Sequence, residues 1–368
     1  MTLSLALLPL MGPGCVDYEI VRHDATDVFY QDPEAEVDIL LVVDNSCSMD
    51  PYQEKLSQNF NQFIRFFESA NVDYQIGVVT TGVPPAAVNS AAGCTQQVIN
   101  QLPGAGELVG GHIITPETAD AEEVFIEAVS VGICGSGSEM GLEAAYLALT
   151  EPLITGTNSG FLRETASLSL IFVSDEEDLS PAPVNDYINA YRDIKGQRSR
   201  DVYNASALVL TERAECSLDQ LNAGSRGLRY LDVADQSAGV IGNICDSDFE
   251  HIVTELSLNS SRLLNTFFLS ATPSPSTLQV TVNDEEIPCD AGVWEYVEIA
   301  GEGEVALDTG GGDTGAPEGE LRPAVSFAVE HIPVADSQIA IRYDGGFGGV
   351  EDWCSADTND TSTATTAE

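Results

Sequence analysis

Residues 37–50 read VDILLVVDNSCSMD, an apolar run that ends abruptly in an acid followed by two serines. A nearly uninterrupted apolar run of this length is typical of a strand that is covered on both faces, as in a parallel sheet. Asp44, Ser46 and Ser48 then follow at alternate positions. Two interpretations are open: these side chains cap the next helix, or they are oxygen ligands of a metal ion.

The rest of the first 270 residues alternates between buried strands and helical patterns. Further strands are predicted within DYQIGVVTTG (73–82), ASLSLIFVSDEEDLS (166–180), YNASALVLTE (203–212) and NTFFLS (265–270). Helices are predicted within PYQEKLSQNFNQFIRFFESA (51–70), ETADAEEVFIEAVS (117–130), EMGLEAAYLALT (139–150), PVNDYINAYRDIKG (183–196) and DSDFEHIVTELSLNSSRLL (246–264). This order predicts an α/β fold: a doubly wound, mostly parallel, Rossmann-like sheet with helices on both faces.

After this region the apolar residues alternate with polar ones, which predicts a small β-rich unit. We divide the chain into a signal segment (1–15), an acidic tether (16–36), the α/β domain (37–272), the β-rich unit (276–350) with an acidic Gly-rich loop (301–322), and a disordered tail (355–368).

The charge balance limits the partners. The 368 residues include 14 Lys and Arg against 59 Asp and Glu, a formal net charge of -45. Such a chain repels phosphate backbones and anionic lipid headgroups, so we expect no nucleic-acid binding. Adaptation to a saline habitat would also account for the acidity, which therefore names no function by itself.

The first residues, MTLSLALLPLMGPGC, contain an apolar run too short to span a bilayer, as in the core of a signal peptide. Cys15 follows small residues and resembles a bacterial lipoprotein cleavage site. We expect an exported lipoprotein of the cell envelope or outer surface, attached to the membrane only through a lipid on Cys15. An ordinary cleaved signal with secretion, and a cytosolic start, are the alternatives.

The eight cysteines include no CxxC pair, which argues against zinc-ribbon and thioredoxin-like sites. Scattered cysteines in an exported protein are typically disulfide-bonded. We expect the pairs Cys216–Cys245 and Cys289–Cys354. A third pair is drawn from Cys47, Cys94 and Cys134, which leaves one thiol over.

No catalytic motif is found. The four histidines (His23, His112, His251 and His331) have no metal-ligand spacing, and GxSxG and GxxxxGK[ST] are absent. We expect no enzyme.

Asp44 and Asp175 both follow strong buried strands, and ligands of such folds bind at the carboxyl ends of the strands. The DNSCS stretch together with Asp175 in FVSDEED resembles the von Willebrand factor type A family. The resemblance implies a metal-ion-dependent adhesion site in which Ser46 and Ser48 coordinate the ion directly and Asp44 and Asp175 act chiefly through waters. It also implies Mg²⁺, with Ca²⁺ or Mn²⁺ as alternatives, and a protein ligand whose Asp or Glu carboxylate completes the shell.

One ligand departs from the family pattern. Members carry a Thr before the third helix, whereas the corresponding stretch here, GICGSGSEMGLEA (132–144), has none. Ser136, Ser138 and Glu139 are the candidates, and we expect Glu139 or Ser136 to face the metal, held loosely. The closer resemblance is to exported bacterial type A proteins, many from myxobacteria, through VDILLVVDNSCSM, FLRETASLSLIFVSDEEDLS, NICDSDFEHIV and the β-unit stretches VWEYV and IAIRY.

The expected function is metal-dependent binding of a protein ligand, in adhesion or assembly at the bacterial cell envelope. The alternative is a structural surface or scaffold lipoprotein on the same fold with a degenerate or empty metal site.

Overall fold

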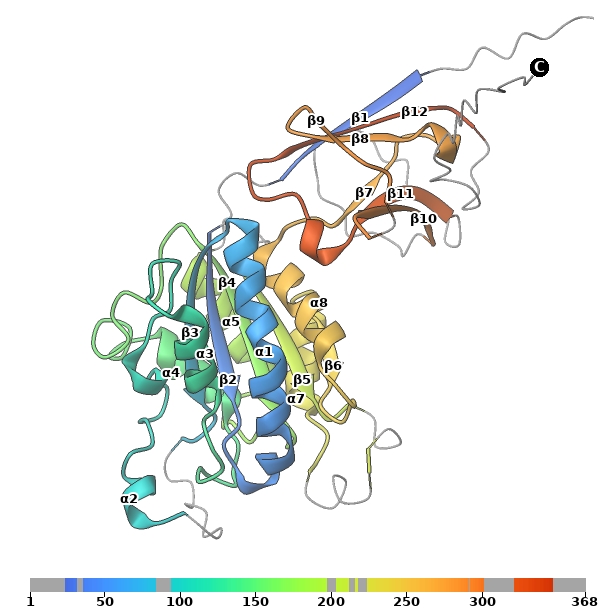
Figure 1. The fold of residues 1–368 in the computed structure, drawn as a ribbon. Coiled ribbons are helices and arrows are strands. Elements are labelled where there is room, and N and C mark those ends of the chain that lie inside the picture. The colour runs from blue at the N-terminus through green and yellow to red at the C-terminus, as the bar shows by residue number, and fades with distance from the viewer. Residues whose placement is uncertain are drawn as a thin grey trace, which may run out of the picture.

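The apolar run before Asp44 forms the second strand of a five-stranded parallel sheet with the order β3-β2-β4-β5-β6 (Figure 1). The computed structural model describes residues 24–31, 36–83, 94–196, 203–211, 216–217, 224–290, 292–300 and 321–346. The strands of this sheet are β2 (Glu36–Val43), β3 (Asp73–Thr80), β4 (Ser167–Ser174), β5 (Tyr203–Val209) and β6 (Ile241–Asn243). All four neighbouring pairs are parallel, which confirms an α/β fold around a parallel sheet.

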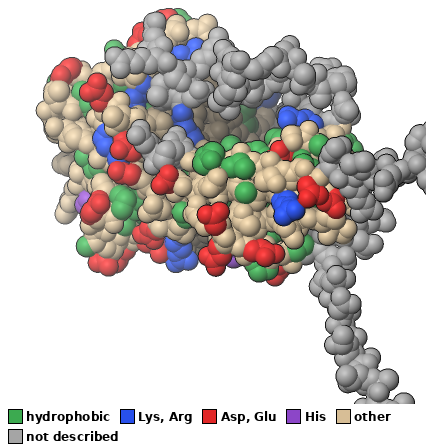
Figure 2. Space-filling model, turned by 90° about the horizontal axis from the view of Figure 1, so that it is seen from above, with side chains coloured by type: hydrophobic (Ala, Val, Ile, Leu, Met, Phe, Trp, Pro, Cys, Tyr) green, Lys and Arg blue, Asp and Glu red, His purple; other side chains and the backbone are tan. Residues whose placement is uncertain are grey.

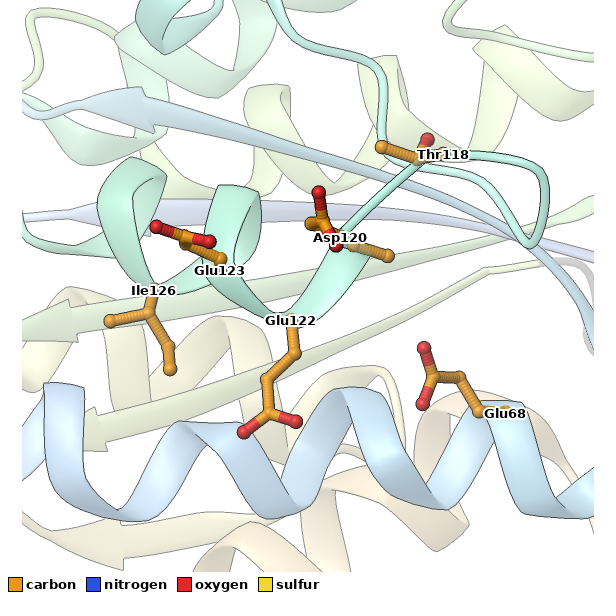
Figure 3. A pocket seen from close by; sticks show the side chains of 7 residues that line it. Glu68, Thr118, Asp120, Glu122, Glu123 and Ile126 are labelled. Atoms are coloured by element: carbon orange, nitrogen blue, oxygen red, sulfur yellow. The ribbon is translucent and has the colours of Figure 1, made fainter.

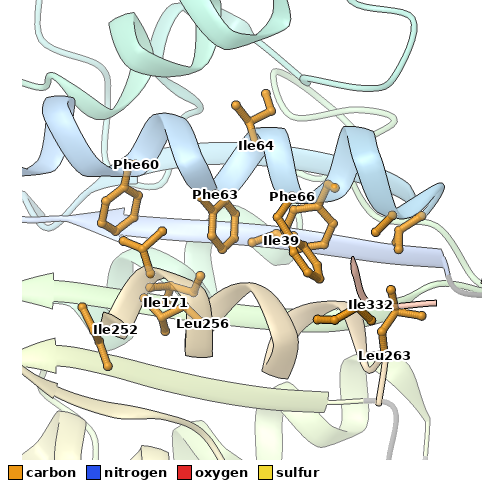
Figure 4. Close-up of a cluster of buried hydrophobic side chains, with 14 of the residues drawn as sticks. Ile39, Phe60, Phe63, Ile64, Phe66, Ile171, Ile252, Leu256, Leu263 and Ile332 are labelled. Carbon is orange, nitrogen blue, oxygen red and sulfur yellow. The ribbon is translucent and has the colours of Figure 1, made fainter. Parts of the chain in front are cut away.

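Helices cover both faces of this sheet, because alternate residues of β2 belong to different cores. Ile39, Leu41 and Val43 pack with helices α1 and α8, whereas Leu40 and Val42 pack with α4, α5 and α7. Figure 4 shows Phe60 and Phe63 of α1 directed toward the sheet and α8. The helices are α1 (Asp50–Ala70), α2 (Gln96–Ile99), α3 (Ala121–Val129), α4 (Gly141–Leu149), α5 (Val184–Lys195), α7 (Leu228–Gln236) and α8 (Glu250–Ser261), with short 3-10 turns η1 (Cys47–Met49) and η2 (Val109–Gly111).

The strand order reverses between β2 and β4. The chain runs from β2 outward to β3, then returns past β2 to β4 and continues outward on the other side to β5 and β6. A reversal of this kind leaves a crevice at the carboxyl ends of the two strands on either side of it. Asp44 and Asp175 directly follow these two strands, so the topology brings them to one edge of the sheet.

The β-rich unit contains two antiparallel sheets, with the orders β1-β12-β8-β9 and β10-β11-β7. Its strands are β1 (Asp24–Tyr30), β7 (Thr266–Phe268), β8 (Gln279–Val282), β9 (Glu285–Ile287), β10 (Trp294–Ala300), β11 (Leu321–Phe327) and β12 (Gln338–Asp344), with 3-10 turns η5 (Pro275–Thr277) and η6 (Val329–His331). The unit lies at the end of the α/β domain away from the carboxyl edge of the sheet (Figure 1). There, the amide of Ala335 donates to the carbonyl of Ala70, the last residue of α1.

Two elements differ from their predicted places. Residues 24–30, predicted as part of a tether, form β1, which pairs along its whole length with β12. The tether prediction is therefore wrong for these residues: Ala25, Asp27 and Phe29 lie on the half-buried face of the strand, and Asp27 accepts hydrogen bonds from Ser270 and Tyr343. Strand β7, predicted to be the last strand of the α/β domain, pairs instead with β11. The predicted signal segment, Cys15, most of the loop 301–322 and the tail 355–368 lie outside the described residues.

Two disulfides join described residues, Cys94–Cys134 and Cys216–Cys245. The pair Cys216–Cys245 was predicted. The pair Cys94–Cys134 joins two of the three candidates for the third disulfide, and the remaining candidate, Cys47, is a free, exposed thiol. Cys289 is also disulfide-bonded, and its predicted partner Cys354 lies outside the described residues. Disulfides form and persist in oxidising environments, so these pairs indicate a protein that folds outside the cytosol. Among the described residues, no helix has the length and apolar character needed to cross a bilayer.

The acidic residues are spread over the surface. Figure 2 shows Asp and Glu side chains distributed across the drawn face, with few Lys and Arg between them. A field of this kind favours cations and basic groups over anions near the protein.

Candidate metal centre

The DNSCS loop and the residue after β4 converge at the carboxyl edge of the sheet. The hydroxyls of Ser46 and Ser48 are 2.8 Å apart, and Ser48 Oγ donates to Oδ1 of Asp175 at 3.0 Å. The amide of Ser46 donates to Oδ1 of Asp44 at 2.7 Å. Four of the predicted ligands, two acids and two hydroxyls, therefore form one continuous cluster.

Helix capping does not account for these side chains. Helix α1 begins at Asp50 after Met49, and no side chain caps it through a hydrogen bond. The 3-10 turn η1 likewise has no side-chain cap from Ser46. The hydroxyls of Ser46 and Ser48 instead contact each other, and that of Ser48 also contacts Asp175.

Asp44 is fully buried and lies at the centre of the cluster. Ser174 Oγ donates to its Oδ2 at 2.6 Å, so both carboxylate oxygens accept hydrogen bonds. Burial nevertheless raises the pKa of Asp44, although the hydrogen bonds from Ser174 and Ser46 oppose the rise. An anion held this far from water is stabilised by a positive charge beside it.

Asp175 is also a buried carboxylate with a raised pKa. It is fully buried, and its Oδ2 has no hydrogen-bond partner. Burial raises the pKa of Asp175 to about 7, and the negative charge of Asp44 adds to the rise. The neighbouring Glu176 is half-buried, and its pKa is raised by burial and then by the charge of Asp44.

Of the candidates for the missing Thr, the structure brings Glu139 to the cluster. Ser136 Oγ instead accepts from the amide of Ser138 at 2.9 Å, which closes a local turn. Glu139 is fully buried and accepts a hydrogen bond from the hydroxyl of Thr81, and its Oε1 has no partner. Burial raises the pKa of Glu139 to about 10, and the charge of Asp44 contributes to that rise.

Hydrogen bonds hold the backbone around Glu139 in place. The amide of Leu179 donates to the carbonyl of Glu139 at 2.6 Å, and the amide of Met140 donates to the carbonyl of Thr81 at 3.0 Å. Glu139 also forms an isolated antiparallel bridge with Gly82. The backbone on both sides of the carboxylate is therefore fixed to the end of β3 and to the loop after β4.

The acids that follow Asp175 divide into two roles. Asp178 Oδ1 accepts from the amide of Leu142 at 3.1 Å in the first turn of α4, and its Oδ2 pairs with Arg229 at 2.8 Å. Glu177 accepts from the amides of Leu228 and Arg229 at the start of α7. These two acids hold helices in place, so Asp175 and Glu176 are the members of the run that face Asp44.

The residues present fit a divalent cation. Three buried carboxylates lie at one edge, two of them with unpartnered oxygens, and within the described residues no Lys, Arg or His forms an ion pair with any of the three. The same residues contain no group of three or more His, Cys, Asp and Glu side chains arranged to hold a metal by themselves. A cation here would thus depend on the hydroxyls of Ser46 and Ser48, with carboxylates reached through water, which suits Mg²⁺.

Two hollows lie near these elements. A cavity of about 250 Å³ adjoins the cluster and is lined in part by Asn45, Thr80, Gly82, Gly135 and Ser136. The larger one lies at the other end of α1, about 27 Å along the helix from Asp50. Figure 3 shows its acidic lining, with Glu122 reaching toward α1 and Glu68 projecting from that helix. All of its charged lining residues are acids, and none of their atoms is buried without a partner, so nothing in this hollow points to a bound ligand.

Sequence reasoning missed Ser174 and Thr81, which position Asp44 and Glu139. Each is the last polar residue of a buried apolar run, LIFVS and GVVTT. A hydroxyl at the end of such a run is the available signal, because it lies at the same sheet edge as the predicted ligands. The predicted site residues Asp44, Ser46, Ser48, Asp175 and Glu139 are brought together, and Ser136 lies in the adjoining cavity lining.

No protein-family model and no curated protein matches the sequence. Among solved structures, the chain is similar to the pilus adhesin SpaC from Lactobacillus rhamnosus GG in its open conformation, at 11% identity and a TM-score of 0.42, over 87% of this chain and 40% of that one. It is also similar to proximal thread matrix protein 1 from the mussel byssus, in two structures at 11% and 12% identity, each with a TM-score of 0.37 and covering 66% and 67% of this chain and 51% of that one. The chain thus spans about half or less of these proteins, and similarity at this level carries no argument about function.

Proposed function

We propose that this chain is an exported protein-binding module on a von Willebrand factor type A fold, in which a divalent cation at Asp44, Ser46, Ser48 and Asp175 binds a carboxylate of a partner protein. Mg²⁺ is the first choice, with Ca²⁺ and Mn²⁺ as alternatives. In this proposal, the protein lies at the bacterial cell envelope and is anchored by a lipid on Cys15.

The observation that carries the proposal is the chain of short contacts from Ser46 to Ser48 to Asp175, at an edge where a buried carboxylate oxygen has no partner. Hydroxyls are neutral ligands, so they leave most of the charge of a cation uncompensated. Carboxylates that act through water do the same. A cation held in this way keeps an affinity for one further anionic oxygen, which a partner can supply.

The cation would also reverse the local field. The protein as a whole repels acidic partners, with a net charge of -45. A divalent ion is the largest local charge at such a site and makes one point of the surface attractive to anions. Salt would screen the repulsion at distances beyond about 8 Å at physiological ionic strength, and would weaken the direct bond far less.

Calorimetric titration of Mg²⁺ into the chelator-treated full chain tests the proposal. We expect saturable binding at one site, lost in Asp44→Ala and in Ser48→Ala. Asp235→Asn, which removes an exposed acid of helix α7, is the matched control and should bind as wild type does. Absence of binding in wild type, or equal affinities in all four proteins, would refute the cation mechanism and leave the structural surface protein as the better interpretation.

A further inference from the structure

Glu139 is a third buried carboxylate at this edge of the sheet, and its charge interacts with that of Asp44. Three negative charges exceed the two positive charges of a divalent cation, so this site is not left short of anionic ligands in the way that a site with two acids is.

The side chain has one free oxygen at the site. The Thr81 hydroxyl donates to Oε2 of Glu139, while Oε1 is buried and makes no hydrogen bond. Asp44 is close enough for its charge to act strongly on Glu139, and each carboxylate affects the other. The ionised form of a carboxylate buried in this way is costly unless something positive binds it.

The backbone around Glu139 leaves little room for this residue to move away from the site. Glu139 is bridged to Gly82, its carbonyl accepts from Leu179, and the next amide donates to Thr81. The disulfide between Cys94 and Cys134 further ties down the loop that leads to it. Release of the carboxylate from the site would therefore need a rotation of the side chain away from Thr81 rather than a shift of the loop.

We propose that Glu139 is an internal ligand of this site: its free oxygen binds the cation in competition with the partner's carboxylate, and Thr81 is the positioning residue that holds it there. This inference rests on the function proposed above and adds its regulation. The native site would retain its cation well and bind external carboxylates weakly. A partner would gain access only by displacing Glu139, so the residue sets a threshold for binding.

The test measures cation affinity and carboxylate affinity separately on the full chain. Glu139→Gln keeps the shape of the side chain and removes its charge, and Glu127→Gln removes one charge from an exposed position on α3 as the matched control. Mg²⁺ binding is measured by calorimetry. The carboxylate probe is N-acetyl-aspartate methylamide, titrated into Mg²⁺-saturated protein. Water-proton relaxation of the Mn²⁺-loaded proteins reports the exchangeable waters on the ion.

We expect Glu139→Gln to weaken Mg²⁺ binding at least tenfold, to strengthen probe binding at least tenfold and to raise the relaxation enhancement. The control should match wild type in all three. Unchanged Mg²⁺ and probe affinities in Glu139→Gln, with wild type binding Mg²⁺, would overturn this inference alone. No Mg²⁺ binding in wild type would overturn the proposed function as well, so the two failures are distinct.

Thr81 variants test the same inference if Glu139→Gln fails to fold. Thr81→Val removes the hydroxyl with little change in shape, and Thr81→Ser keeps it. We expect Thr81→Val to shift both affinities in the directions given for Glu139→Gln, and Thr81→Ser to restore them to wild-type values. Equal behaviour of the two variants would mean that Thr81 does not position the carboxylate and would overturn its role.

Discussion

The hydroxyl of Ser174 donates a 2.6 Å hydrogen bond to Oδ2 of Asp44. The bond joins the last residue of β4 to the first residue after β2, across the reversal of strand order. The same hydroxyl accepts from the amide of Glu176 at 3.0 Å. Ser174 therefore links the acid of one loop to the backbone of the other and fixes the spacing of the two halves of the candidate site.

Replacement of Ser174 by Ala should weaken both the fold and the site. A hydrogen bond to a charged acceptor contributes about 1.5–3 kcal/mol, and its loss leaves Oδ2 of Asp44 buried without this donor. We expect the free energy of unfolding in urea to fall by about 2 kcal/mol and Mg²⁺ affinity to fall with it. Ser57→Ala, at a surface hydroxyl that bonds a helix carbonyl, is the control and should change neither.

Gly135 should not tolerate a side chain, whereas Gly137 should. A Cβ at Gly135 would lie 1.8 Å from Oδ1 of Asn45, but a Cβ at Gly137 would meet nothing within 4 Å. Overpacking of a filled site costs about 1–3 kcal/mol. We expect Gly135→Ala to lower stability by that amount and to weaken Mg²⁺ binding because it displaces the loop that carries Ser46. If Gly137→Ala has the same effect, the close approach of Asn45 is not the cause.

The metal-free protein should lose stability as the pH rises. The pKa of Asp175 is raised from 3.8 to about 7, so the folded state holds this proton more tightly than the unfolded state does. The stabilisation from the protonated group is fully present below about pH 4 and is lost as the pH passes through 7. The loss is at most about 4 kcal/mol. Glu139, with a pKa of about 10, extends the decline to higher pH.

Urea unfolding in chelator between pH 4 and pH 9 measures this decline. Asp175→Asn should show a flatter profile, since the titrating group is gone, and Asp235→Asn should follow wild type. Added Mg²⁺ should stabilise wild type most at the high end of the range, where the carboxylates are ionised. A wild-type profile as flat as that of Asp175→Asn would contradict the prediction.

The opposite end of β2 carries a buried ion network whose loss should affect stability alone. Asp38 is fully buried and pairs with Nε of Arg163 at 2.8 Å and with Nζ of Lys195 at 3.3 Å. Removal of one partner from a buried pair costs about 3–5 kcal/mol. Arg163→Met should lower the free energy of unfolding by about 3 kcal/mol. Arg65→Met, whose pair with Glu122 is largely exposed, should change it far less.

Mg²⁺ affinity separates this network from the site. Asp38 and Asp44 are about 20 Å apart along the strand. We therefore expect both arginine variants to bind Mg²⁺ as wild type does at temperatures where they are folded. A loss of affinity in Arg163→Met would mean that the two ends of β2 are coupled.

The parallel sheet was predictable because continuous apolar runs are typical of strands that are covered on both faces. The position of Asp44, Ser46 and Ser48 at the carboxyl edge of the sheet was predictable because they follow such a run directly. The short strand β6 was missed because it has only three residues. Helix α7 was missed although its buried residues Tyr230, Val233 and Ala234 lie at helical spacing. The sequence also did not show that Glu177 and Asp178 hydrogen-bond helix amides whereas Asp175 does not. Consecutive acids give the same sequence signal, and their roles depend on which helices pack beside them.

Strand β1 was misassigned for a different physical reason. Its partner β12 lies more than 300 residues away, with Asp24 opposite Asp344. A short strand with two acids and a threonine among its seven residues has no local feature that distinguishes it from a solvated segment. Only the distant partner makes it a strand, and sequence periodicity reports local structure.

That pairing has a consequence for how the chain folds as it is made. Synthesis and export both proceed from the N-terminus, so β1 emerges before the other strands. It stays unpaired until its partner strand, residues 338–344, follows. All five strands of the parallel sheet come in between and can assemble beforehand. Such distant contacts are slow to close, and an unpaired strand is exposed to other chains in the meantime. The carboxylates of Asp24 and Asp27 give the unpaired strand negative charge, which disfavours aggregation until β12 has been made.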